Sequence, residues 1–199
     1  MASFSDQPIG EGAMLVARPR YRRAAWDRLR PLLRPRYIGA LAVALPLVVF
    51  AFLRFGAGGR FAVAAFLIAS LCLLSAIDLT ERRLPNRIVL PSAAVVLFAQ
   101  TVLFPDQALE WTLAALGTSL LLLLLWCVYP AGLGMGDVKL ALLLGAALGS
   151  AVLTALFLGA AAASVYAVFL LARDGAEARK QSIPLGPFLA FGAIVVVLL

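Results

Sequence analysis

Long apolar stretches, separated by short breaks of glycine, proline and charged residues, dominate the chain. A helix needs about 20 mostly apolar residues to cross a bilayer. Gly56-Ala57-Gly58-Gly59 and Pro105-Asp106-Gln107 predict turns between such stretches. We expect one membrane-spanning helix in each of the following ranges: 37–53, 61–77, 88–104, 108–129 and 184–199.

The apolar run 138–172 is too long for one ordinary span and slightly short for two. Loops on the cytoplasmic side of a membrane carry an excess of Lys and Arg. If the run folds as a hairpin near Gly149-Ser150, all of the 17 basic residues except Arg54 and Arg60 fall on one side. The pattern therefore predicts an all-α, polytopic membrane helix bundle of about seven transmembrane helices with a cytoplasmic N-terminus.

The composition agrees with a membrane protein. Hydrophobic residues make up 63% of the 199 residues, and the mean hydropathy is +1.00. Such values exclude a water-soluble globular domain, so we expect a lipid bilayer around the chain. We divide the chain into a basic cytoplasmic tail (1–36), a first transmembrane helix with its outer loop (37–60) and a membrane domain (61–199).

Arginine is concentrated before the first apolar run. A basic segment of this kind can bind nucleic acid, but next to a membrane helix it is typical of a tail that fixes orientation and contacts anionic lipid headgroups. We therefore expect no nucleic-acid partner. The arginines are Arg18, Arg20, Arg22, Arg23, Arg28, Arg30, Arg34 and Arg36.

The chain has few groups that hold metals or cofactors. It contains no histidine, and its two cysteines, Cys72 and Cys127, lie singly inside apolar runs. Zinc sites and disulfide frameworks require several such ligands at short spacing. We expect no metal, no disulfide and no cofactor.

Two acids stand at the ends of apolar runs. Asp78 follows the run 61–77 and Asp137 precedes the run 138–172, and the charge count places both on the cytoplasmic side. A carboxylate at the mouth of a membrane helix is costly, which makes it a functional hypothesis. Two neighbouring carboxylates cannot both ionise cheaply, so one keeps a proton while the other acts as a base. This pair suits hydrolysis of an amide by water without a metal.

Glycines precede the second acid. Gly134 and Gly136 are expected to permit backbone angles closed to other residues and to let an extended substrate approach closely. We expect both to belong to an active-site loop with Lys139. The lysine has two interpretations: a membrane anchor that extends to the interface, or a charge that acts on Asp137.

Each acid also has a structural interpretation. Asp137 alone could be the N-cap of a helix after a glycine turn. Asp78 alone could be an interfacial acid that pairs with Arg82 or Arg83.

Three stretches in this order resemble one enzyme family. They are Ile77-Asp78 with Leu84-Pro85-Asn86, then Gly134-Met135-Gly136-Asp137-Val138-Lys139-Leu140, then Ile183-Pro184-Leu185-Gly186-Pro187-Phe188-Leu189-Ala190-Phe191-Gly192. Over roughly residues 61 to 192 the chain resembles the prepilin peptidases, the type IV leader peptidases of the GxGD aspartyl protease group.

The resemblance implies a function. It makes Asp78 and Asp137 a catalytic dyad, with Gly134 and Gly136 shaping the loop of the second aspartate. It implies a multi-pass plasma-membrane endopeptidase, active at the cytoplasmic side, that removes the leader from prepilin or pseudopilin precursors with an N-terminal apolar helix. Longer, bifunctional members carry paired cysteines and also methylate the new N-terminus. The absence of such cysteines makes this chain resemble a short, peptidase-only form.

Two other functions compete with this one. A proton-coupled transporter could use Asp78 and Asp137 as proton sites. However, the chain shows no internal repeat, and both acids are expected at the membrane edge rather than at its midplane. A non-catalytic pilus or secretion assembly protein is the third candidate, but it has no chemical need for either aspartate.

Overall fold

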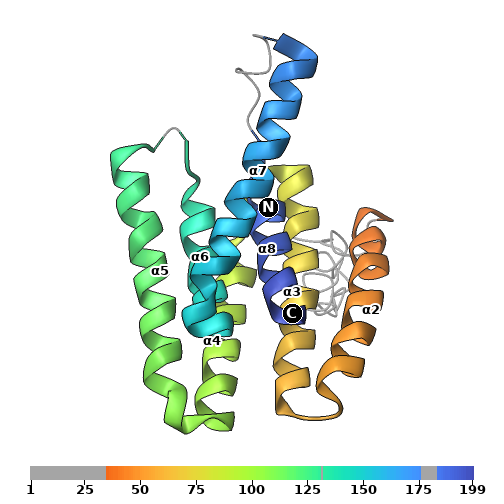
Figure 1. The fold of residues 1–199 in the computed structure, drawn as a ribbon, viewed down its shortest axis with the longest axis vertical. Helices are drawn as coiled ribbons and strands as arrows, with labels where there is room; N and C mark the ends of the chain where they lie inside the picture. The colour runs from red at the N-terminus through yellow and green to blue at the C-terminus, as the bar shows by residue number, and fades with distance from the viewer. Residues whose placement is uncertain (1–34, 131, 176–182) are drawn as a thin grey trace, which may run out of the picture. The chain divides into compact units, whose positions relative to one another are not determined.

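The computed structural model describes residues 35–130, 132–175 and 183–199. This part of the chain is helical and has no strand, so the all-α prediction is confirmed for it. The basic tail up to residue 34, and Arg179 and Lys180, lie outside the described residues. The α-helices in Figure 1 are α2 (Pro35–Phe55), α3 (Gly59–Glu81), α4 (Asn86–Leu103), α5 (Ala108–Val128), α6 (Met135–Leu148), α7 (Val152–Asp174) and α8 (Gly186–Leu198).

These helices make the chain a multi-pass membrane protein. Within the described residues, four stretches are long and apolar enough to cross a membrane: Gly59–Glu81, Asn86–Leu103, Pro105–Val128 and Met135–Asp174. Shorter apolar helical stretches are Gly39–Phe55 and Gly186–Leu198. The total of about seven crossings, the cytoplasmic N-terminus and the domain boundaries stay predictions.

The long apolar run breaks near the expected residues. The short 3-10 helix η3 (Gly149–Ala151) separates α6 from α7, and Gly149 has a φ of 56°, which favours glycine. The Glu110 carboxylate accepts a hydrogen bond from the Ser150 N–H at 3.0 Å, which stabilises the break. Figure 1 shows α7 running back toward the end from which α6 came.

Helix α6 is the most enclosed element of the bundle. It packs against α4, α5 and α8, and most of its residues are buried. The Thr118 hydroxyl of α5 donates to the Ala141 carbonyl of α6 at 3.1 Å. A Cβ on Gly145 would lie 2.5 Å from the Ala114 carbonyl oxygen, so the two backbones are in close contact. Small residues and interhelical hydrogen bonds commonly join membrane helices in this way.

Helix α3 is the second central element, because α2 and α8 both pack against it. Helix α7 packs mainly on α8, where neither Gly159 nor Gly192 has space for a Cβ. The outer helices α5 and α7 expose large apolar side chains, which fits contact with lipid. These side chains include Leu109, Leu113, Leu116, Leu120, Leu124, Phe157, Val165 and Val168.

The antiparallel connections bring the segments that carry the two candidate aspartates to one end of the bundle. Helix α3 finishes at this end, and α4, α6 and α8 begin there (Figure 1). Asp78 lies in the last turn of α3 and Asp137 in the first turn of α6. The fold therefore places two carboxylates that are far apart in the sequence at the same end.

Candidate active site

Asp78 and Asp137 line the same cavity, of about 350 Å³. Both residues are buried, with 7% and 8% of their surface exposed. Their charges are near enough to interact electrostatically. The walls come from the junction of α3 and α4 and from the start of α6, and the other lining residues are Arg82, Arg83, Leu84, Asn86, Gly134, Met135, Gly136 and Lys139. The structure thus brings together all five residues that the sequence suggested for the site.

Asp78 is held by the start of α8. Its Oδ2 accepts a hydrogen bond from the Gly186 N–H at 3.1 Å. A Cβ on Gly186 would lie 2.7 Å from the same oxygen, so this contact requires a glycine. Sequence reasoning included Gly186 in a motif but gave it no function. Arg82 and Arg83, the partners considered for Asp78, line the same cavity.

The end of α3 sets the position of Asp78. Arg82 adopts a left-handed conformation with a φ of 50°, and its N–H donates to the Asp78 carbonyl at 2.9 Å. Two residues later, Leu84 precedes Pro85, and a residue before proline is disfavoured in a helix. The chain therefore leaves the helix directly after the turn that carries Asp78.

Asp137 is held by the turn that starts α6. Gly134 is the N-cap residue, and its N–H donates to the Asp137 Oδ2 at 3.2 Å. In return, the Asp137 N–H donates to the Gly134 carbonyl at 3.0 Å. Asp137 is thus not the N-cap itself but the third helical residue, and its carboxylate bonds back to the N-cap backbone. A carboxylate there is favoured by the positive end of the helix dipole.

The two site glycines act differently from the sequence expectation. Neither has a positive φ: Gly134 has a φ of −82°, and Gly136 lies inside α6. The expectation that these glycines adopt backbone angles closed to other residues was therefore wrong. A Cβ on Gly136 would lie 3.0 Å from the Leu84 Cβ. The glycine lets the junction of α3 and α4 lie close against α6.

Lys139 joins two walls of the cavity. Its Nζ donates to the Asn86 Oδ1 at 2.8 Å, which links α6 to the first residue of α4. Together with Arg82 and Arg83 it places positive charge around the aspartates. Within the described residues there is no cluster of three or more His, Cys, Asp or Glu side chains that could hold a metal ion.

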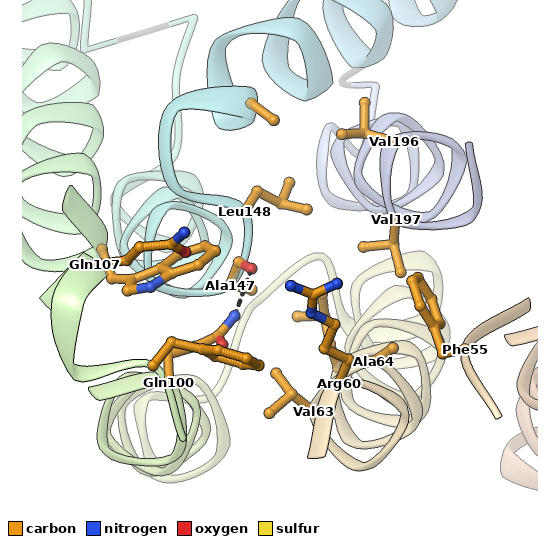
Figure 2. Close-up of a pocket in the computed structure, with 14 residues that line it drawn as sticks. Phe55, Arg60, Val63, Ala64, Gln100, Gln107, Ala147, Leu148, Val196 and Val197 are labelled. Atoms are coloured by element: carbon orange, nitrogen blue, oxygen red, sulfur yellow. Dashed lines mark hydrogen bonds between the residues drawn. The ribbon is translucent and has the colours of Figure 1, made fainter. Parts of the chain in front are cut away.

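A second cavity, of about 290 Å³, lies at the other end of the bundle near the start of α5 and the end of α6 (Figure 2). The Gln100 amide donates to the Ala147 carbonyl at 3.0 Å, and the Arg60 guanidinium lies 5.3 Å from the centre of the Phe104 ring. No carboxylate is among the residues that line this cavity. Of these two cavities, only the first is therefore lined by a pair of acids that could carry out hydrolysis.

Comparisons with known proteins identify relatives of the chain. The profile of the type IV leader peptidase family matches residues 65–171, which include both aspartates but not Gly186. The chain is also 35% identical over 158 residues to a prepilin leader peptidase/N-methyltransferase of Pseudomonas putida. That alignment covers 73% of this chain and 52% of the relative, so the chain spans about half the relative's length. No solved structure matched. With more than half of its residues matched by the profile, the chain belongs to the type IV leader peptidase family.

Proposed function

We propose that the chain is an intramembrane aspartyl endopeptidase that removes the leader peptide from type IV prepilin or pseudopilin precursors. The observation that carries the proposal is the shared cavity. Two buried carboxylates line it, and each is oriented by one backbone N–H at the start of a helix, Gly186 for Asp78 and Gly134 for Asp137. Family membership and the prepilin peptidase relative support the same activity.

The proposed reaction needs only the two aspartates and a water molecule. One carboxylate takes a proton from the water, and the oxygen of that water attacks the carbonyl carbon of the scissile amide. The other, protonated carboxyl stabilises the carbonyl oxygen by hydrogen bonding. The C–N bond then breaks as the leaving nitrogen receives a proton, which gives a free amine and a carboxylic acid. Either aspartate can fill either role in this scheme.

The distribution of charge supports an active site that faces the cytoplasm. The aspartate end carries Arg82, Arg83, Arg87 and Lys139, whereas Arg54 and Arg60 lie at the other end. Because basic residues are enriched on the cytoplasmic side, we assign the aspartate end to that side of the plasma membrane.

The test is cleavage in a host that lacks its own prepilin peptidase. We expect co-expression with a prepilin to yield the shortened product. Asp78→Asn and Asp137→Asn should each lower cleavage at least about a hundredfold, because each removes an acid–base group. Glu110→Gln is the matched control, since this acid lies at the other end and its amide still accepts from Ser150.

Protein level in the membrane is measured in parallel, so that loss of folding is recognised. Undiminished processing by either asparagine variant would remove that aspartate from the mechanism. If the variants instead lost proton-coupled uptake while cleavage never occurred, the transporter hypothesis would replace this one.

A further inference from the structure

A third cavity, of about 770 Å³, forms a groove between α2, α3 and α8. Its lining residues recur every three or four positions along each helix, so each helix contributes one face. On α3 they are Cys72, Ser75, Ala76, Leu79 and Thr80, and on α8 they are Pro187, Ala190, Phe191, Ile194, Val195 and Leu198. The groove therefore runs lengthwise between three helices.

The groove is long enough for a helix. On α2 its lining extends from Gly39 to Phe50, and on α8 from Pro187 to Leu198. At a rise of about 1.5 Å per residue these segments are roughly 16 Å long, or about three helical turns. A groove of this kind is a common docking site for an apolar helix.

The lining chemistry selects an apolar, uncharged occupant. No charged residue lines the groove. The Thr80 hydroxyl is already used, because it lies 3.0 Å from the carbonyl oxygens of Ala76 and Ile77 in its own helix. Ser75 is the other hydroxyl residue in the lining. An occupant must therefore satisfy its own backbone hydrogen bonds, as a membrane helix does.

One end of the groove adjoins the aspartate cavity. Leu79, which lines the groove, directly follows Asp78 in α3. Pro187, which also lines it, directly follows Gly186, the residue that bonds to Asp78. The last turn of α3 and the first turn of α8 thus border both spaces. A chain that extends from a helix in the groove would cross this border to reach the aspartates.

We infer that this groove seats the apolar helix of the precursor substrate, with the scissile bond just beyond the helix at the aspartate cavity. The inference rests on the proposed function and gives it a substrate path. It also assigns a function to α2, which lies outside the region matched by the family profile but forms one wall of the groove.

Photo-crosslinking tests the position of the substrate helix. A photoreactive amino acid replaces Val43 or Phe191, which line the groove and are 58% and 55% exposed. The control is Leu113 on α5, which is 60% exposed but lies outside the groove. All three are made in the Asp137→Asn background, so that the precursor stays intact. We expect adducts with the precursor from positions 43 and 191 and not from position 113.

Lipid adducts alone, adducts with a second copy of the chain, or equal adducts from position 113 would overturn the groove assignment. These outcomes are separable from failure of the proposed function. If the unmodified chain cleaves the precursor but positions 43 and 191 do not crosslink to it, only the groove assignment fails. If the unmodified chain does not cleave the precursor at all, the proposed function fails.

Filling the groove gives an independent readout. Gly39 lines the groove and Gly117 of α5 does not, yet a Cβ at either position would meet no heavy atom within 4 Å. We expect Gly39→Leu to lower the initial cleavage rate about tenfold, since the added side chain would occupy space in which the substrate helix packs. Gly117→Leu should stay within about twofold of the unmodified chain. Equal rates in the two variants would contradict the assignment.

Discussion

The two ends of the helix bundle contain cavities of similar volume, about 350 Å³ and about 290 Å³, but of opposite chemistry. At one end, buried carboxylates accept hydrogen bonds from backbone N–H groups at helix starts. At the other, Arg60 lies over Phe104 and the cavity has no acid in its lining. Volume alone therefore does not distinguish the two cavities of this protein, whereas the placement of carboxylates does.

The acids at the two ends also differ in how they are used. Glu110, at the end without aspartates, is exposed and stabilises a chain reversal through its bond from Ser150. Within the described part of the chain, the carboxylates of Asp78 and Asp137 each accept one hydrogen bond from a backbone N–H, and in both cases the acceptor is Oδ2. The Oδ1 atom of each carboxylate takes no part in these two hydrogen bonds. This contrast is why the asparagine substitutions and Glu110→Gln should differ most.

The next largest effect is expected at Gly186. An alanine there would place its Cβ 2.7 Å from the Asp78 Oδ2, so either the carboxylate or the start of α8 must move. Because small misplacements of catalytic groups are costly, we expect Gly186→Ala to lower the cleavage rate on the order of a hundredfold. Gly117→Ala, in open space, is the control and should cleave normally. Normal cleavage by Gly186→Ala would show that the contact with Asp78 is dispensable.

A smaller effect is expected at Gly136. Alanine favours a helix more than glycine does, so Gly136→Ala should not destabilise α6 itself. Its Cβ would lie 3.0 Å from the Leu84 Cβ and push the junction of α3 and α4 away. We expect about a tenfold loss of cleavage from such overpacking. Adding Leu84→Ala should restore part of the rate, and an absence of any rescue would place the effect elsewhere.

The smallest effect on cleavage is expected at the end without aspartates. Gln100→Leu removes the hydrogen bond to the Ala147 carbonyl and leaves a buried acceptor unpaired. We expect a loss of about 1–3 kcal/mol in the free energy of unfolding, measured in detergent, because such a group is costly to leave unsatisfied. The cleavage rate per folded molecule should stay within about twofold, since substitutions far from the site act independently of it. A large loss of that rate would mean that the two ends are coupled.

Much of the fold could be predicted because each helix is bounded by local signals. The apolar run 108–129 corresponds to α5, Ala108–Val128, which follows a proline turn. The break at Gly149 was expected because its run is too long for one span and because a hairpin there puts nearly all basic residues on one side, and the structure places η3 there. The turn before α5 depends on residues that are neighbours in the sequence, and the break at Gly149 on a count of charges, so neither requires knowledge of contacts between helices.

The contacts of the site could not be predicted in the same way. Gly186 bonds to Asp78 across 108 positions, and no local pattern specifies which oxygen a distant N–H will meet. The short distance between Gly136 and Leu84 likewise depends on how α6 packs against the junction of α3 and α4. A glycine directly before a proline at a helix start was the available signal for Gly186. Its partner became visible only in three dimensions.

The bond between Asp78 and Gly186 has a consequence for biosynthesis. When the ribosome has added Asp78, 108 further positions must be translated before the partner of this carboxylate exists. During that interval α3 carries an acid without its backbone donor, at a helix end whose insertion into lipid is costly. Helix α8 therefore completes the proposed catalytic centre, and a nascent chain that stalls before residue 186 should be inert toward any precursor it meets.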